Sequence, residues 1–192
     1  MNLFSIEQLS ATWFQGSIDP LKGASRRLRS LEAASLIHRA KAACHPLLPL
    51  SDPIFTWFSE EPEPNFGAIS HRLQSRWTEA LKPTTLFCAT PKAIRRYGGK
   101  GKRLSPVQAT HDIHVAAIYL RLLRDRPQEA RAWVSEATLT ASRRNQKLPD
   151  AEIHNGAGEP VLVIEFGGSY TAERVQRIHE DCVLRETAYE LW

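Results

Sequence analysis

The segment from Leu148 to Gly168, LPDAEIHNGAGEPVLVIEFGG, constrains the fold more than any other part of the chain. Its residue pattern predicts one strand over 150–154, a glycine-containing turn over 155–159 and a buried strand over the apolar run 160–166. Antiparallel pairing about that turn would bring Asp150 beside Glu165. Two carboxylates at that separation can share a divalent cation such as Mg²⁺ or Mn²⁺, which takes oxygen ligands and activates a water. The segment therefore predicts the layout of a metal-dependent nuclease core.

This segment resembles the PD-(D/E)XK nuclease signature. Pro149-Asp150 corresponds to the first part of the signature and Glu165-Phe166-Gly167 to the second. The resemblance implies a lysine at the position of Gly167, where it would orient the attacking water and stabilise developing negative charge. Lys147, just before the motif, is the candidate for a displaced catalytic lysine. We therefore expect either a nuclease-like domain that has lost hydrolysis or a divalent-metal-dependent DNA endonuclease that uses Asp150, Glu165 and Lys147.

The same two acids also have structural interpretations. Asp150 follows a proline and could serve as a turn or strand-entry residue. Glu165 could pair with Arg174 or Arg177, which lie on the helix expected to follow. Neither arginine would replace a catalytic base, because a guanidinium holds its proton at any working pH.

The flanking segments predict the rest of a small α/β layer. Residues 127–140 indicate a helix or a helix–strand junction, 171–185 an amphipathic helix and 187–192 a short strand. The nuclease resemblance implies an extra acid on the first helix, and Glu136 stands at that place as a third metal ligand, although it could equally be a solvated carboxylate. This half could also form a homodimer or dock a partner through its aromatic residues. Those residues are Trp133, Tyr170, Tyr189 and Trp192.

Charge is distributed unevenly along the chain. Residues 1–110 contain fifteen Lys or Arg against eight Asp or Glu, whereas residues 111–192 contain ten against thirteen. A cationic half favours contact with a polyanion such as nucleic acid, since neutralising phosphates releases counterions.

Composition also bounds the compartment. No apolar run reaches 18 residues, and the first residues lack the basic and apolar regions of a signal peptide. The three cysteines are far apart and odd in number, which argues against a disulfide framework or a Cys-x-x-Cys zinc site. We expect a cytoplasmic protein that does not interact with membranes.

The cationic half begins with two expected helices. The first covers 5–14 with Ser5 as its cap, and the second begins at Asp19-Pro20 and runs to Ile37. With a β-like run over 38–50, they give the outline of a winged helix-turn-helix whose second helix enters the major groove of double-stranded DNA. The alternative is that the cations of this helix are simply solvated. The candidate DNA-binding residues on this helix are Lys22, Arg26, Arg27 and Arg29.

The middle of the chain predicts a helix over 66–81, a strand over 84–89 and a short helix over 91–97. The stretch GGKGKRLSP over 98–106 indicates a basic linker, which divides the chain into a DNA-binding domain over 1–97 and a nuclease-like domain over 107–192. Two histidines, His111 and His114, could ligate a metal from one helix face but more readily cap or pack the helix start. Three linker cations could follow a phosphate backbone, namely Lys100, Lys102 and Arg103.

The order of these parts resembles the replication-relaxation family of plasmid and mobile-element proteins. The resemblance lies in the winged-helix start, TPKAIRRYG over 90–98, THDIHVAAIYLRLL over 110–123, and the later LPDAEI and IEFGGSY. It implies a DNA-binding protein of plasmid or mobile-element replication or transfer. The predicted fold class is α+β, with an N-terminal winged helix-turn-helix followed by a small α/β restriction-endonuclease-like domain.

Overall fold

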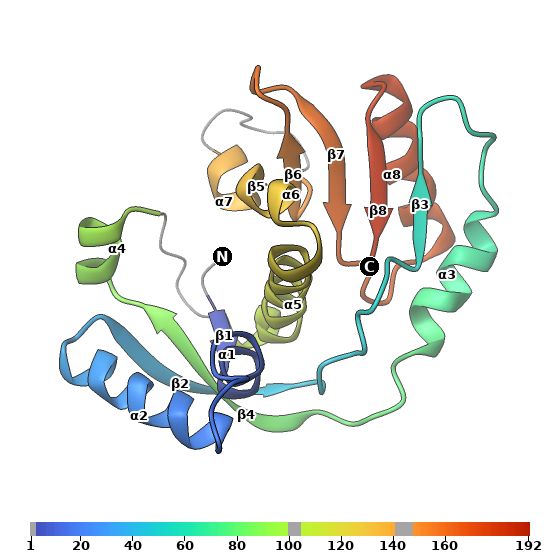
Figure 1. The fold of residues 1–192 in the computed structure, drawn as a ribbon. Helices are drawn as coiled ribbons and strands as arrows, with labels where there is room; N and C mark the ends of the chain where they lie inside the picture. Colours follow the sequence, from blue (N-terminus) through green and yellow to red (C-terminus); the bar gives the residue numbers. More distant parts are fainter. Residues whose placement is uncertain (1–2, 100–104, 141–147) are drawn as a thin grey trace. The chain divides into compact units, whose positions relative to one another are not determined.

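The protein has a mixed α and β architecture with two separate sheets. The computed structural model describes residues 3–99, 105–140 and 148–192. Two compact units share the chain: unit 1 comprises Met1–Leu47 and Glu79–Leu120, and unit 2 comprises Leu48–Thr78 and Arg121–Trp192. Each unit contains one of the sheets (Figure 1). Each also has a hydrophobic core of its own.

Unit 1 is built on a three-stranded antiparallel sheet in the order β1-β4-β2. Its core joins Leu3, Leu86 and Cys88 of the sheet to Ala109 and Ile113 at the start of α5. The elements of unit 1 are β1 (Leu3–Ser5), α1 (Ile6–Trp13), α2 (Pro20–Ala33), β2 (Ile37–Cys44), β4 (Lys82–Ala89), α4 (Pro91–Tyr97), the 3-10 turn Pro106–Gln108 and the first part of α5 (Ala109–Asp125).

The two N-terminal helices begin where the sequence predicts them. Ser5 and Gln8 form a reciprocal capping box at the start of α1, and the Asp19 side chain accepts the Lys22 N–H at the start of α2. The second helix ends at Ala33 rather than at Ile37, because Ser35 adopts a left-handed φ of 56° that no α-helix continues. Residues from Ile37 onward form β2, which ends at Cys44 and so is shorter than the expected run to Leu50.

Unit 2 is built on a five-stranded mixed sheet in the order β3-β8-β7-β6-β5. Strands β5, β6 and β7 form an antiparallel meander, and the crossover helix α8 returns the chain so that β8 lies parallel to β7. Figure 1 shows α8 covering the sheet. The elements of unit 2 are β3 (Phe55–Trp57), α3 (Phe66–Ser75), the end of α5, α6 (Pro127–Arg131), β5 (Trp133–Ser135), α7 (Glu136–Leu139), β6 (Ala151–His154), β7 (Pro160–Glu165), α8 (Ala172–Leu184) and β8 (Ala188–Leu191).

The division into units differs from the split at residues 98–106. The segment 48–78 lies between β2 and β4 in sequence, yet its strand β3 pairs with β8 at the edge of the second sheet. Its helix α3 packs on α8, with Ile69 and Leu73 in one core with Val175 and Ile178. A contiguous N-terminal domain over 1–97 is therefore corrected: burial of the apolar side chains of β3 and α3 assigns this segment to unit 2. Among the described residues, no helix is long and apolar enough to cross a membrane.

Candidate functional sites

The hairpin β6–β7 brings the two acids of the nuclease-like motif to one end of the sheet. The predicted strand pairing is confirmed: Ala151 lies opposite Ile164, so Asp150 and Glu165 flank the same end of the ladder. Both acids lie near the Tyr170 hydroxyl. Burial raises the pKa of Tyr170, and the negative charges of Glu165 and Asp150 raise that pKa further.

Protein donors engage both carboxylates. The Phe166 N–H donates to Asp150 Oδ2 at 2.8 Å, and the Tyr170 hydroxyl donates to Glu165 Oε2 at 2.7 Å. Arg174 donates in turn to the Tyr170 oxygen at 2.9 Å, with its guanidinium carbon 3.9 Å from the centre of the tyrosine ring. The arrangement accounts for both acids as structural acceptors, one for a strand end and one for a buried hydroxyl.

The third expected metal ligand does not join this pair. Glu136 is exposed at the first position of α7, where its backbone N–H donates to the Asp150 carbonyl at 3.0 Å. Within 3–99, 105–140 and 148–192 there is no group of three or more His, Cys, Asp or Glu side chains able to hold a metal ion. The set Glu136, Asp150 and Glu165 is thus corrected to two acids with protein partners.

The position of the family's lysine is sterically closed. A Cβ atom added at Gly167 would lie 2.5 Å from Cδ2 and 2.8 Å from Cδ1 of Leu73, a fully buried residue of α3. The backbone of Gly167 also donates to the Trp192 carbonyl at 2.9 Å. A lysine side chain at this position would require the buried Leu73 side chain to move. The proposed substitute, Lys147, lies outside the described residues.

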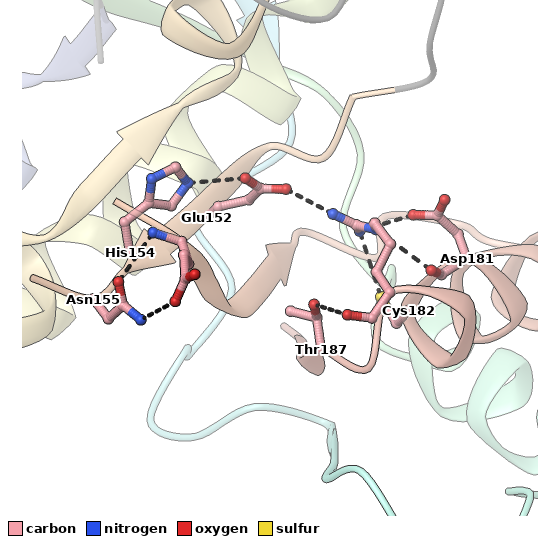
Figure 2. Close-up of polar contacts among 8 residues, drawn as sticks. Glu152, His154, Asn155, Asp181, Cys182 and Thr187 are labelled. Carbon is pink, nitrogen blue, oxygen red and sulfur yellow. Dashed lines mark hydrogen bonds and ion pairs between the residues drawn. The ribbon is translucent and has the colours of Figure 1, made fainter. Parts of the chain in front are cut away.

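A second acidic cluster on the same sheet was missed by the sequence analysis. Glu152 is completely buried and lies between His154, at 3.0 Å, and Arg185, at 2.8 Å (Figure 2). Arg185 also forms an ion pair with Asp181 at 2.7 Å. The available signal was an acid between the apolar residues Ala151 and Ile153 of the predicted strand. Because Arg185 contacts both the buried Glu152 of β6 and the more exposed Asp181 of α8, the cluster is a structural network that links this strand to the end of the helix.

The cations of α2 separate into two faces. Lys22, Arg26 and Arg29 follow one another at helical spacing and are exposed, and within the described part of the chain no ion pair engages them. Arg27 lies on a different side of the helix, where it lines an apolar pocket together with Leu28 and other residues. Of the four predicted DNA-binding residues, three therefore form one stripe and the fourth does not.

Helix α4 supplies a second basic surface in unit 1 that the sequence analysis did not assign to DNA. Thr90 caps α4 and its hydroxyl also donates to the carbonyl of Ser35, while Lys92 Nζ donates to the Ala34 carbonyl, so α4 starts beside the end of α2. Arg95 and Arg96 are exposed in its last turn. The signal was available as the basic run KAIRR. The linker cations Lys100, Lys102 and Arg103 lie outside the described residues.

Burial bears on two other interpretations. Of the aromatic residues considered for a dimer or partner interface, Tyr170, Tyr189 and Trp192 are buried in unit 2 and cannot form an outer surface. His114 is completely buried and its Nδ1 contacts the Thr110 carbonyl at 2.6 Å, which supports a packing role.

Comparison of the chain with protein-family models, curated proteins and solved structures gave no match.

Proposed function

We propose that the protein binds double-stranded DNA through unit 1, acting as a winged helix-turn-helix whose second helix, α2, enters the major groove. Following the family resemblance, its role is in plasmid or mobile-element replication or transfer in the cytoplasm. Unit 2 is a nuclease-like α/β domain that has lost hydrolysis. The observation that carries the proposal is the exposed stripe Lys22, Arg26 and Arg29, with no ion pair to it in the described part of the chain.

The arrangement of unit 1 supports this role. Helices α1 and α2 pack against each other, six residues separate them, and the antiparallel pair β2–β4 follows. Such an arrangement presents the second helix on the surface, with its N-terminal residues directed at base edges. Lys22 stands in the first turn of α2, and Arg26 and Arg29 extend the same stripe by two turns.

The charge of unit 1 supports a polyanionic partner. In sequence, unit 1 contains thirteen Lys or Arg against five Asp or Glu, a balance of +8, while unit 2 contains twelve against sixteen, a balance of −4. Thr90 and Lys92 of α4 donate to backbone carbonyls at the end of α2, which holds the start of α4 beside that helix. Exposed cations without internal ion pairs can release counterions from DNA without first breaking such pairs.

Three features support the proposal that unit 2 is nuclease-like but no longer hydrolyses DNA. Its helix, antiparallel strands, crossover helix and parallel strand follow the order expected of a nuclease-like layer. Asp150 and Glu165 nevertheless accept hydrogen bonds from Phe166 and Tyr170. Gly167 excludes the lysine that would complete the site.

The test is DNA binding by the full chain as a function of salt. A fluorescent duplex should bind with an affinity that falls steeply with salt, by a slope of roughly 0.9 for each phosphate contact. Replacing Arg26 and Arg29 together by Ala should weaken binding by about 1–3 kcal/mol for each arginine that reaches a base edge. The matched control Arg72→Ala removes an exposed arginine of α3 in unit 2 and should leave affinity unchanged. A flat salt response, or equal losses in both variants, would reject the proposal.

The alternative function is a Mg²⁺- or Mn²⁺-dependent DNA endonuclease, favoured by the juxtaposition of Asp150 and Glu165 at one hairpin end. Plasmid nicking in the presence of either metal, abolished by Asp150→Asn, would establish it. The Asn side chain still offers an oxygen to the Phe166 N–H, so this variant removes the charge while leaving that acceptor in place. We expect no nicking from either protein.

A further inference from the structure

Unit 1 contains an apolar pocket with a volume of about 360 Å³. This volume lies within the roughly 300–1,000 Å³ that small-molecule sites occupy. Every residue that lines it belongs to unit 1, so its walls do not depend on how the two units are placed. The pocket lies between α1, α2 and the three-stranded sheet, and nearly all of its surface is carbon.

The walls are preformed by packing within unit 1. Four aromatic rings line the pocket, those of Phe4, Trp13, Phe14 and Phe87. Phe4 and Trp13 meet edge to face with ring centres 6.5 Å apart. The ring of Phe14 lies against Gly23 so closely that a Cβ at Gly23 would come within 2.9 Å of it. These contacts hold the aromatic walls in place while leaving Trp13 54% exposed, which is unusual for a side chain that serves only as core.

One residue with a charged side chain lies among the residues that line the pocket. Among the described residues that line the pocket, Arg27 alone carries a charge, and it lies on the same helical stripe as Ala24, Leu28 and Leu31. No ion pair to Arg27 occurs in the described part of the chain. Its guanidinium can offer two parallel donors to a carboxylate, a geometry that a lysine lacks.

We propose that this pocket binds a small apolar monoanion, an aliphatic or aryl carboxylate, with its apolar body between the aromatic walls and its carboxylate on Arg27. The pocket size restricts the ligand to one short chain or ring system. The single cation selects against neutral and cationic molecules of the same shape. This inference does not depend on DNA binding, because Lys22, Arg26 and Arg29 form the opposite stripe of α2.

The probe is octanoate, compared with 1-octanol and octylammonium, in calorimetric titrations of the full chain. Octanoate should bind saturably with one site per chain, 1-octanol at least about tenfold more weakly and octylammonium not at all, since only the anion gains the charge-assisted contact. Absence of saturable octanoate binding at concentrations up to about 10 mM, or equal affinities for octanoate and 1-octanol, would overturn the proposal.

Two variants locate the site. Arg27→Met keeps an unbranched stem and removes the charge, so it should lose the preference for octanoate while retaining 1-octanol. Ala89→Trp fills the pocket from an exposed lining position and should reduce both affinities. Lys41→Met, which removes an exposed cation of β2 that does not line the pocket, should leave octanoate binding unchanged. Arg27→Met and Lys41→Met losing octanoate binding equally would overturn the assignment to this pocket.

A second copy of the chain is the competing occupant of the pocket. In that case the wild type would sediment as a dimer, Ala89→Trp would sediment as a monomer, and octanoate would compete with dimer formation rather than bind a monomer. Sedimentation velocity of both proteins separates these outcomes. The proposal expects the same sedimentation coefficient for both and is overturned by a dimer that Ala89→Trp dissociates.

Discussion

Selected cations of the two units differ in whether they have an internal partner. In unit 1 the stripe of α2 and the last turn of α4 present arginines that no described ion pair neutralises. In unit 2 two arginines form ion pairs within the protein: Arg185 pairs with Glu152 and Asp181, and Arg126 pairs with Glu129 and Glu190. Charge held against an internal partner contributes to the fold, whereas exposed charge without one is available to an external polyanion. Net charge alone would not have revealed this difference.

The largest expected effect comes from breaking the internal pairing of unit 2. Arg185→Met removes the guanidinium from the completely buried Glu152 carboxylate and should lower the free energy of unfolding by about 3–5 kcal/mol, the usual cost of removing one partner from a buried ion pair. Denaturant unfolding followed by circular dichroism measures this loss. As a control, Arg177→Met removes an exposed arginine of α8 that donates to the backbone carbonyl of Glu173. This variant should change the free energy of unfolding by less than about 0.5 kcal/mol.

A double variant guards against simple loss of folding. Combining Arg185→Met with Glu152→Gln removes the stranded charge and should recover part of the stability. If Arg177→Met and Arg185→Met lower the free energy of unfolding by equally small amounts, the contrast between cations with internal partners and exposed cations would not hold.

The second prediction concerns the closed position in the nuclease-like motif. Gly167→Ala places a Cβ against Leu73 and should destabilise the protein by about 1–3 kcal/mol, the cost of overpacking a filled core. Adding Leu73→Val should relieve part of the crowding, so the two changes should be non-additive. Thermal unfolding of the single and double variants measures the coupling. A neutral Gly167→Ala would mean that the motif has room for a longer side chain and would revive the endonuclease alternative.

Local signals in the sequence predicted much of the fold. The capping residues Ser5 and Asp19, and the turn between β6 and β7, place elements within a few residues of their observed limits. These features depend on neighbours in sequence, which is why they are legible without a structure. The strand β3 was not predicted, because three residues that pair with the distant β8 carry no local pattern.

The candidate site was only partly predictable for a related reason. The proximity of Asp150 and Glu165 follows from the register of the hairpin. Predicting it requires only the position of the turn and the residue pattern of the two strands. Their hydrogen-bond partners follow from tertiary contacts: Tyr170 reaches back to Glu165 from beyond the strand, and Leu73 closes Gly167 from a segment almost a hundred residues earlier. The two-sided nature of α2 was readable from spacing, but the pocket beside Arg27 depends on how α1 and the sheet pack around it.

The third prediction tests whether the available charge of unit 1 extends beyond α2. Replacing Arg95 and Arg96 of α4 together by Ala should reduce the slope of log affinity against log salt by roughly 2, since each arginine–phosphate pair accounts for about 0.9 of that slope. Discrimination between DNA sequences should not change, because phosphate contacts carry no direct sequence information. Anisotropy titrations at several salt concentrations provide both readouts. An unchanged slope would confine the DNA contact to α2.

The smallest expected effect concerns unit 2 and is the pH dependence of stability that arises from the buried Tyr170. Burial, with Glu165 and Asp150 adding to it, raises the pKa of Tyr170 in the folded protein, while an unfolded tyrosine has a pKa of about 10. The folded protein therefore keeps a proton that the unfolded chain loses. Its contribution to stability is complete below the unfolded pKa and declines as pH rises above it, by about 1.4 kcal/mol per pH unit.

Tyr170→Phe removes this titration and so should flatten the fall in stability between about pH 10 and 11. Part of the fall should persist in the variant, because burial also raises the pKa of Tyr189 and raises the pKa of the Cys182 thiol to about 12. Loss of the bond to Glu165 lowers stability at every pH, so the slope and not the midpoint is the measurement. Urea unfolding at closely spaced pH values gives that slope. Identical slopes for Tyr170→Phe and the wild type would mean that Tyr170 keeps an ordinary pKa, and that Glu165 is not committed to a buried hydroxyl.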